Sequence, residues 1–144
     1  LRMSDIHAAL GIPQLERLAE VTKTRADNAA ALTCGLKDRT PSVRLPQIPA
    51  GRTPVWHQFT ILLPEAAKRE AVRSRMADAG VQTGIYYPAL VWDHPPYRGH
   101  PQVVKDETPR AAAVAARCLS LPVHPKVGPR ETERVVAALE RSLT

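Results

Sequence analysis

Apolar residues near the start of the chain recur at three- and four-residue steps, the spacing of amphipathic helices. Ser4 is a favourable N-cap and Asp5 stands in the first turn, so a short helix is predicted to begin here. We expect Gly11 and Pro13 to break it, because proline cannot continue a helix interior. A longer helix is predicted next, and Gly35 lies near its C-terminal end, where a left-handed residue is common. Its Ala-rich apolar stripe comprises Leu15, Leu18, Ala19, Thr22, Ala26, Ala29, Thr33 and Leu36.

The middle of the chain carries segments with strand character. Residues 55–63 are rich in aromatic and β-branched side chains and predict the main strand. Residues 43–45 predict a short edge strand, because the prolines that follow cannot donate to a central ladder. Residues 81–86 predict a strand interrupted by Gly84, and residues 119–121 predict a last short strand.

Proline marks the start of three further predicted helices. The first runs from Pro64 to about Ala79 and stops at Gly80, and the second, rich in alanine, runs from Pro109 to Cys118. The last begins at Gly128-Pro129, with a predicted buried face of Thr132, Val135, Val136, Leu139 and Leu143. The order αα-β-β-α-β-α-β-α predicts an α+β fold with a small antiparallel or mixed sheet packed under helices. With 144 residues, we expect one domain, 1–144.

Charge and hydropathy narrow the classes of partner. The net charge is +6, and the excess of Lys and Arg is spread over the whole chain rather than gathered in a basic arm or stripe. Aromatic residues make up only 4% and do not alternate with the basic ones as a stacking platform requires. We therefore expect no nucleic-acid partner. No apolar run approaches the roughly 20 residues that cross a bilayer, so no membrane partner is expected either.

Cysteine and histidine spacing give no sign of a metal site. Cys34 and Cys118 both fall on predicted helices and lack a CxxC neighbour, so we expect buried or half-buried thiols in a reducing, cytoplasmic compartment. His94 and His100 are not four residues apart on a helix, the spacing that brings two imidazoles to one metal ion. The expectation is that the chain binds no metal.

Within its twelve residues, the segment 86–97 brings together several aromatic and ionisable side chains. It contains three tyrosines, Trp92, Asp93 and His94 between prolines. One interpretation is an ordered loop whose rings cover the core. The other is a pocket wall, because rings with polar tips suit the faces of sugars and cofactors. The residues alone leave both interpretations open.

Four ordered stretches resemble the DegT/StrS-type sugar aminotransferases, fold-type I enzymes that use pyridoxal phosphate. They are Arg2-Met3-Ser4-Asp5-Ile6-His7-Ala8-Ala9-Leu10-Gly11 with Gln14-Leu15 after it, His57 to Leu63, Ala79 to Pro88, and Leu119-Ser120-Leu121-Pro122-Val123-His124-Pro125. The resemblance extends over essentially the whole chain. It implies the fold of the C-terminal small domain of a fold-type I aminotransferase, acting on nucleotide-linked keto-sugars in a homodimer.

The resemblance also implies site residues. Arg2 would bind the cofactor of the neighbouring subunit near its phosphate, while Tyr86, Tyr87, Trp92 and His94 would face the sugar substrate. The chain begins just after the position of an asparagine that precedes the matching arginine in the family. It also has Val-Trp where a Leu-His pair is usual, and His94 where glutamine is common. The identity of the sugar is therefore left open.

The family's large domain, with its Schiff-base lysine, has no counterpart among these stretches. None of the five lysines (Lys23, Lys37, Lys68, Lys105 and Lys126) matches its motif. We therefore expect a truncated chain with no catalytic residue of its own, no pyridoxal phosphate bound to it alone, and no transaminase activity. The alternative is a non-catalytic binding or interaction domain that reuses the scaffold, with exposed apolar area that favours self-association.

Overall fold

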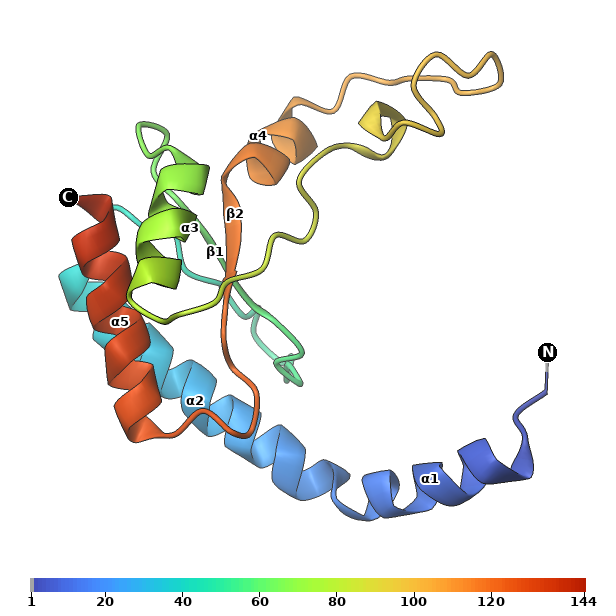
Figure 1. Cartoon of the computed structure of the whole chain (residues 1–144), viewed down its shortest axis with the longest axis vertical. Helices are drawn as coiled ribbons and strands as arrows, with labels where there is room; N and C mark the ends of the chain where they lie inside the picture. Colours follow the sequence, from blue (N-terminus) through green and yellow to red (C-terminus); the bar gives the residue numbers. More distant parts are fainter. Residues whose placement is uncertain (1) are drawn as a thin grey trace.

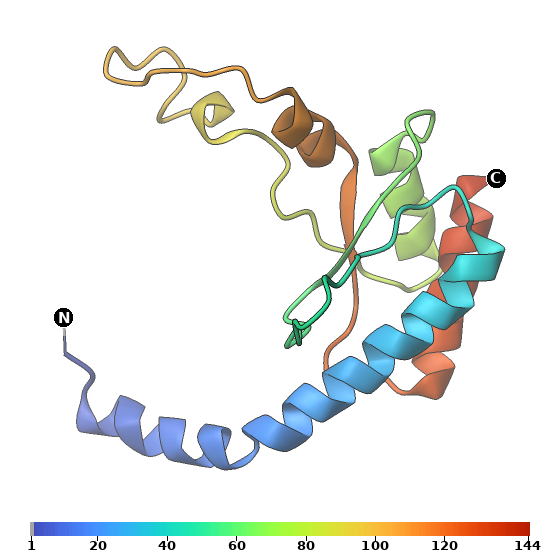
Figure 2. The ribbon, with the colours of Figure 1, turned by 180° about the vertical axis from the view of Figure 1, so that it is seen from behind.

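The computed structural model describes residues 2–144 and contains helices of several lengths around a short sheet. Along the chain the elements are α1 (Asp5–Glu16), α2 (Leu18–Arg39), β1 (Phe59–Leu62), α3 (Arg69–Asp78), the 3-10 helix η1 (Val91–Asp93), α4 (Pro109–Arg117), β2 (Cys118–Leu121) and α5 (Pro129–Leu143). The α2, α3 and α5 helices and the two strands form the main body (Figure 1). The α1 helix and the segment 88–108 project from it as two arms, which the reverse view also shows (Figure 2). The prediction of an α+β fold is confirmed.

The sheet is antiparallel and shorter than predicted. Phe59 pairs with Leu121 and Leu62 with Cys118, so the paired strands are four residues long. On the outer edges, Arg44 bridges Leu62 and Gly84 bridges Ser120, each as an isolated pair. The strands predicted at 43–45 and 81–86 therefore contribute one bridge each, as expected for a Pro-flanked edge and for a Gly-interrupted segment.

The strand predicted over 55–63 begins later because Trp56 leaves the extended conformation. Its φ of 47° lies in the left-handed region, which few non-glycine residues adopt. Arg25 of α2 holds this turn, since its Nη1 donates to the carbonyl oxygens of Trp56, at 3.0 Å, and His57, at 3.2 Å. The extended ladder starts at Phe59, whose ring lies 5.5 Å from that of Trp56.

The boundary between the first two helices was predicted wrongly. Ser4 is the N-cap as expected, and its hydroxyl accepts a hydrogen bond from the His7 N–H at 3.4 Å. The α1 helix then continues through Pro13 to Glu16, with the break at Arg17. Pro13 removes one N–H donor, but no residue of α1 is buried, so water can bond the carbonyl left free.

Two other helix boundaries also differ from the predictions. The α3 helix begins at Arg69 rather than Pro64, because residues 64–68 form turns and Lys68 is extended. The α4 helix ends at Arg117, so Cys118 is not helical and opens β2. Gly35 lies inside α2 with helical geometry instead of serving as a left-handed cap.

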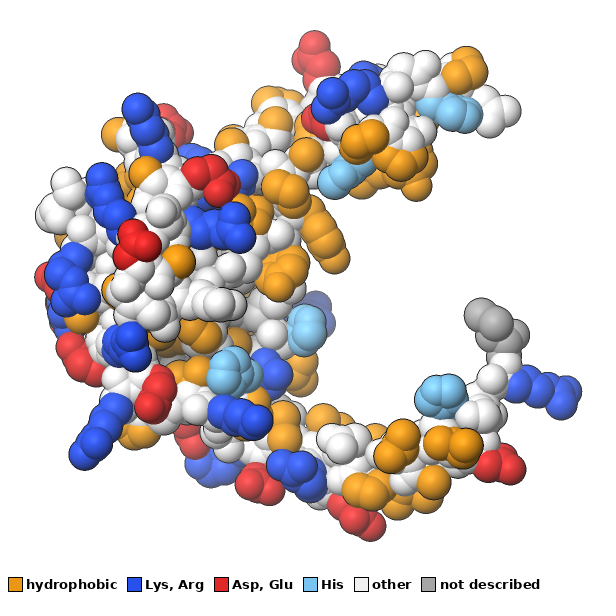
Figure 3. Space-filling model, in the orientation of Figure 1, with side chains coloured by type: hydrophobic (Ala, Val, Ile, Leu, Met, Phe, Trp, Pro, Cys, Tyr) orange, Lys and Arg blue, Asp and Glu red, His pale blue; other side chains and the backbone are white. Residues whose placement is uncertain are grey.

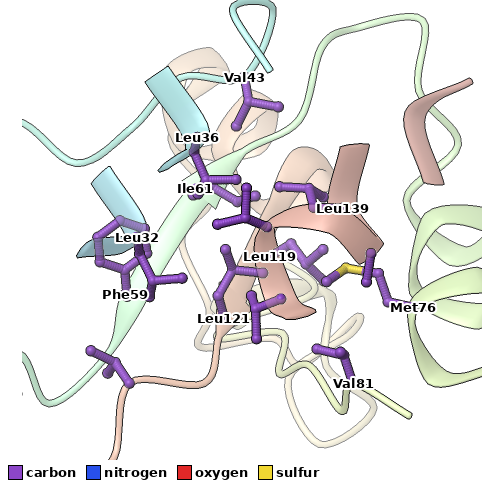
Figure 4. Packing of buried hydrophobic residues seen from close by; sticks show 14 of the residues in the cluster. Leu32, Leu36, Val43, Phe59, Ile61, Met76, Val81, Leu119, Leu121 and Leu139 are labelled. Carbon is purple, nitrogen blue, oxygen red and sulfur yellow. The ribbon is translucent and has the colours of Figure 1, made fainter. Parts of the chain in front are cut away.

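The core lies between the sheet and the inner faces of three helices (Figure 4). The α5 helix packs against both α2 and α3. Its predicted buried face is confirmed at Thr132, Val135, Val136 and Leu139, whereas Leu143 is only partly buried. The largest buried side chains of the other elements are Leu32, Leu36, Phe59, Ile61, Leu63, Met76 and Leu119.

The environments of the cysteines differ from each other. Cys118 is buried as expected, but Cys34 is exposed on α2, which corrects the prediction for that residue. Both are free thiols. Within residues 2–144, no helix combines the length and the apolar character needed to span a membrane.

Candidate functional site

A groove of about 600 Å³ opens between three segments that are distant in sequence. Residues 57–58 precede β1, residues 80–84 follow α3, and residues 120–127 lead from β2 toward α5. Side chains of α2 and α5 complete the wall. The groove has a polar rim and apolar walls, and the side chains that carry its chemistry are Arg25, His57, Tyr86, His124, Lys126, Glu131 and Arg134.

The turn before α5 presents His124 and Lys126 at the groove. The Val127 N–H donates to the His124 carbonyl at 2.9 Å, and the Lys126 N–H donates to the His124 Nδ1 at 3.3 Å. The Asn28 amide of α2 donates to the same His124 carbonyl, which ties the turn to the main body. With Nδ1 accepting, the neutral imidazole carries its proton on Nε2. The Lys126 side chain is exposed.

The end of α3 forms the opposite wall. Gly80 has φ = 73° and closes the helix. The Arg134 guanidinium of α5 lies over this glycine, and its Nε and Nη2 donate to the Ala79 carbonyl at 3.0 and 2.7 Å. These bonds satisfy a carbonyl at the helix end while leaving the positive charge of Arg134 at the groove.

Tyr86 lines the groove, and its ring packs on Gly84. A Cβ at position 84 would collide with the ring, so the close approach requires glycine there. Tyr87 points away and is 72% exposed, with its ring 6.2 Å from that of Tyr86 in an edge-on arrangement. Tyr86 therefore lines a pocket, as the second interpretation of the 86–97 segment expected, whereas the exposed ring of Tyr87 does not cover the core.

The other predicted site residues lie elsewhere. Trp92 borders a smaller hollow of about 270 Å³ together with Leu90 and residues 106–109. His94 opens a turn, its carbonyl accepting hydrogen bonds from the N–H groups of Tyr97 and Arg98. Arg2 is exposed beside the N-terminal end, on the arm that carries α1 (Figure 1). In this chain the five residues do not converge on one site.

The sequence profile of the DegT/DnrJ/EryC1/StrS aminotransferase family matches residues 1–140. The chain belongs to this family. It is 30% identical over 138 residues to the dTDP-3-amino-3,4,6-trideoxy-alpha-D-glucose transaminase of Streptomyces venezuelae, covering 96% of this chain and 35% of that protein. It is 28% identical over 142 residues to the dTDP-3-amino-3,6-dideoxy-alpha-D-galactopyranose transaminase of Aneurinibacillus thermoaerophilus, covering 97% of this chain and 36% of the relative.

Solved structures agree with this assignment. DesV of S. venezuelae, in complex with a ketimine intermediate, superposes with a TM-score of 0.86 at 30% identity, covering 97% of this chain and 36% of DesV. DesI, crystallised in the presence of its TDP-sugar product, gives a TM-score of 0.87 at 28% identity, covering 98% of this chain and 36% of DesI. The chain thus spans little more than a third of the length of the family members it matches.

DegT/DnrJ/EryC1/StrS aminotransferases use pyridoxal phosphate, and the groove does not fit this cofactor. An aminotransferase needs a lysine amine for the aldehyde and an anionic partner for the pyridine nitrogen. The lysine of the groove, Lys126, is exposed on a turn, and the carboxylate, Glu131, accepts a hydrogen bond from the Gly128 N–H at 2.9 Å. We therefore assign no step of transamination to the groove. In residues 2–144, no cluster of three His, Cys, Asp or Glu side chains could hold a metal ion.

Sequence reasoning missed the groove itself. Arg25, His57 and the turn that carries His124 and Lys126 come from three distant parts of the chain, so periodicity could not group them. The one available signal was the resemblance, because three of its quoted stretches, 57–63, 79–88 and 119–125, are the segments that the fold brings together here.

Proposed function

We propose that this chain forms the C-terminal small domain of a pyridoxal-phosphate-dependent aminotransferase that acts on nucleotide-linked keto-sugars. The observation that carries the proposal is the match of residues 1–140 to an aminotransferase family, on a fold that superposes on DesV with a TM-score of 0.86. Relatives named as transaminases of dTDP-linked amino sugars supply the substrate class.

In this proposal the chain contributes residues that surround the cofactor. The covalent chemistry takes place on a large domain that bears the Schiff-base lysine. Pyridoxal phosphate, when bound there, withdraws electrons from the carbon that carries the transferred amine. Arg2 is exposed and forms no ion pair within residues 2–144, so its guanidinium is free to bind a phosphate of a neighbouring subunit's cofactor.

The aromatic residues of the 86–97 segment are proposed to contact the sugar nucleotide. Tyr86 and Tyr87 present exposed rings, and Trp92 is half-buried next to a hollow. Such rings stack on sugar and base faces while their polar tips donate hydrogen bonds. His94 follows η1 and contributes an imidazole at the same end of the arm.

We propose a homodimer in the cytoplasm, supported by the apolar surface of the two arms (Figure 3). The large apolar side chains of α1 and its flanks are all more than half exposed, namely Met3, Ile6, Leu10, Ile12, Leu15 and Leu18. A soluble monomer rarely exposes so many on one element, so this surface is proposed to be covered in the assembled enzyme. The same surface supports the alternative, a non-catalytic interaction domain that associates through α1.

The test is to add pyridoxal phosphate and a keto-sugar nucleotide to the purified 144-residue chain and pass the mixture through gel filtration. We expect no absorbance band of cofactor covalently bound to a lysine to elute with the protein, and no amino transfer from glutamate. A retained band together with amino transfer would overturn the assignment of the chemistry to a separate large domain. A parallel sedimentation measurement distinguishes a self-associating chain from a monomer.

A further inference from the structure

We propose that the groove between residues 57–58, 80–84 and 120–127 is a binding site for a small organic dianion, a phosphate monoester with an apolar or aromatic body. This inference does not depend on the proposed aminotransferase function. It rests on the charge of the groove, on its unpaired donors and on its apolar lining.

The charge of the groove is positive and is not neutralised by the protein. Arg25, Lys126 and Arg134 line it, against the single carboxylate of Glu131. None of these three cations belongs to an ion pair within residues 2–144. The two arginines instead donate to neutral backbone carbonyls. Three positive charges against one negative charge leave two positive charges, which matches a dianion.

The donors that remain suit a phosphate. The Lys126 ammonium makes no side-chain hydrogen bond in the described structure, and Arg25 uses only Nη1 for its two carbonyls. The imidazoles of His57 and His124 also line the groove and add donors. Charged donors of this kind form shorter and stronger hydrogen bonds to phosphate oxygens than neutral donors do.

Part of the groove lining is apolar, which favours a ligand with an apolar body over a bare ion. This part is built from the buried side chains Val81, Leu121, Val123, Val127 and Val135. The volume of about 600 Å³ lies within the range of small-molecule sites.

Nuclear magnetic resonance titration of the 144-residue chain with phenyl phosphate tests the site directly. We expect the amide signals of residues 80–84 and 122–127 to shift and saturate. Phenol, which has the same body without the charge, should produce no saturating shift at these residues, and inorganic phosphate should bind more weakly than phenyl phosphate. Absence of saturable shifts in the groove with phenyl phosphate, or shifts confined to another surface, would overturn the proposal.

A pair of lysine variants separates a built site from general attraction to a basic protein. Lys126→Ala removes one donor without breaking any side-chain contact, so the variant should fold normally, and we expect its dissociation constant for phenyl phosphate to rise about tenfold. Lys23→Ala, on the exposed face of α2 in an ion pair with Asp27, removes the same charge away from the groove and should leave the constant within about twofold. Equal effects of the two substitutions would contradict the proposal.

Discussion

Gly35 of α2 packs directly on Val136 of α5, so closely that a Cβ at position 35 would lie 2.9 Å from the Val136 Cγ2. Val136 is buried in the core, so it can shift only by disturbing its packed neighbours. Gly35→Ala should therefore destabilise the chain by about 1 kcal/mol, because an overpacking cost of roughly 1–3 kcal/mol exceeds the helix-propensity gain of about 0.5–1 kcal/mol. Urea unfolding followed by circular dichroism measures the change.

Gly11→Ala is the matched control, since Gly11 also lies within a helix but has nothing within 4 Å of its would-be Cβ. Here only the propensity gain remains, so stability should stay the same or rise by up to about 1 kcal/mol. If both alanine variants changed stability in the same direction, the contact between Gly35 and Val136 would not be what requires glycine.

Leu139 and Leu10 give a second contrast, between the core and the α1 arm. Leu139 is fully buried on α5, whereas Leu10 is 65% exposed on α1. Leu139→Ala should lower the free energy of unfolding by about 2–5 kcal/mol, through lost burial and the cavity it leaves. Leu10→Ala should change it by less than about 0.5 kcal/mol in the monomeric chain. A comparable loss from Leu10→Ala would mean that α1 is packed against another surface in solution.

Arg39 joins the C-terminal end of α2 to two carboxylates of α5. Its Nε and Nη2 donate to Glu140 Oε2 at 2.9 and 2.6 Å, and its Nη1 lies 2.5 Å from Glu133 Oε1. Hydrogen bonds from Arg39 to Glu140 and then to Glu133 raise the pKa of Arg39 above its ordinary value. A raised pKa of a cation stabilises the fold at pH values below the pKa of that group in the unfolded chain, so this contribution does not vary through the neutral range, where glutamate side chains are ordinarily ionised.

Glu140→Gln removes the partner that raises the pKa of Arg39 the most. We expect a small fall in the thermal midpoint at low ionic strength, and a smaller difference from the unsubstituted chain in 1 M salt, where the Debye length is about 3 Å. Glu65→Gln, which loses a single long contact to Arg117 on an exposed carboxylate, serves as the comparison and should be near neutral. A salt-independent loss for Glu140→Gln would indicate that packing rather than charge explains the effect.

The presence of the core helices α2, α3 and α5 was predictable from their apolar spacing, although the end of α2 and the start of α3 were not. The α5 helix began at the expected Gly-Pro and buried the expected face. The C-terminal end of α1 was not predictable in this way. The helix tolerates Pro13 and has no buried residue, so no packing contact determines where it ends. The main strand was overestimated because an arginine from another element, Arg25, stabilises the left-handed turn at Trp56.

The candidate site was also predictable from sequence only in part. The aromatic segment 86–97 was found from local composition, but its residues are distributed between the groove, the smaller hollow and solvent. The groove depends on contacts between residues such as Asn28 and His124, 96 positions apart. A pattern within one segment contains no information about such contacts, so local composition and periodicity could not reveal this site.

The most direct test of the proposed function is a chimera in which residues 1–144 replace the matching segment of the S. venezuelae dTDP-3-amino-3,4,6-trideoxy-alpha-D-glucose transaminase, its relative at 30% identity. We expect the chimera to dimerise, retain pyridoxal phosphate and transfer an amino group to a keto-sugar nucleotide, with Arg2→Ala weakening cofactor retention and Lys23→Ala leaving it unchanged. A chimera that folds, dimerises and retains the cofactor but transfers no amino group to any keto-sugar nucleotide would contradict the account.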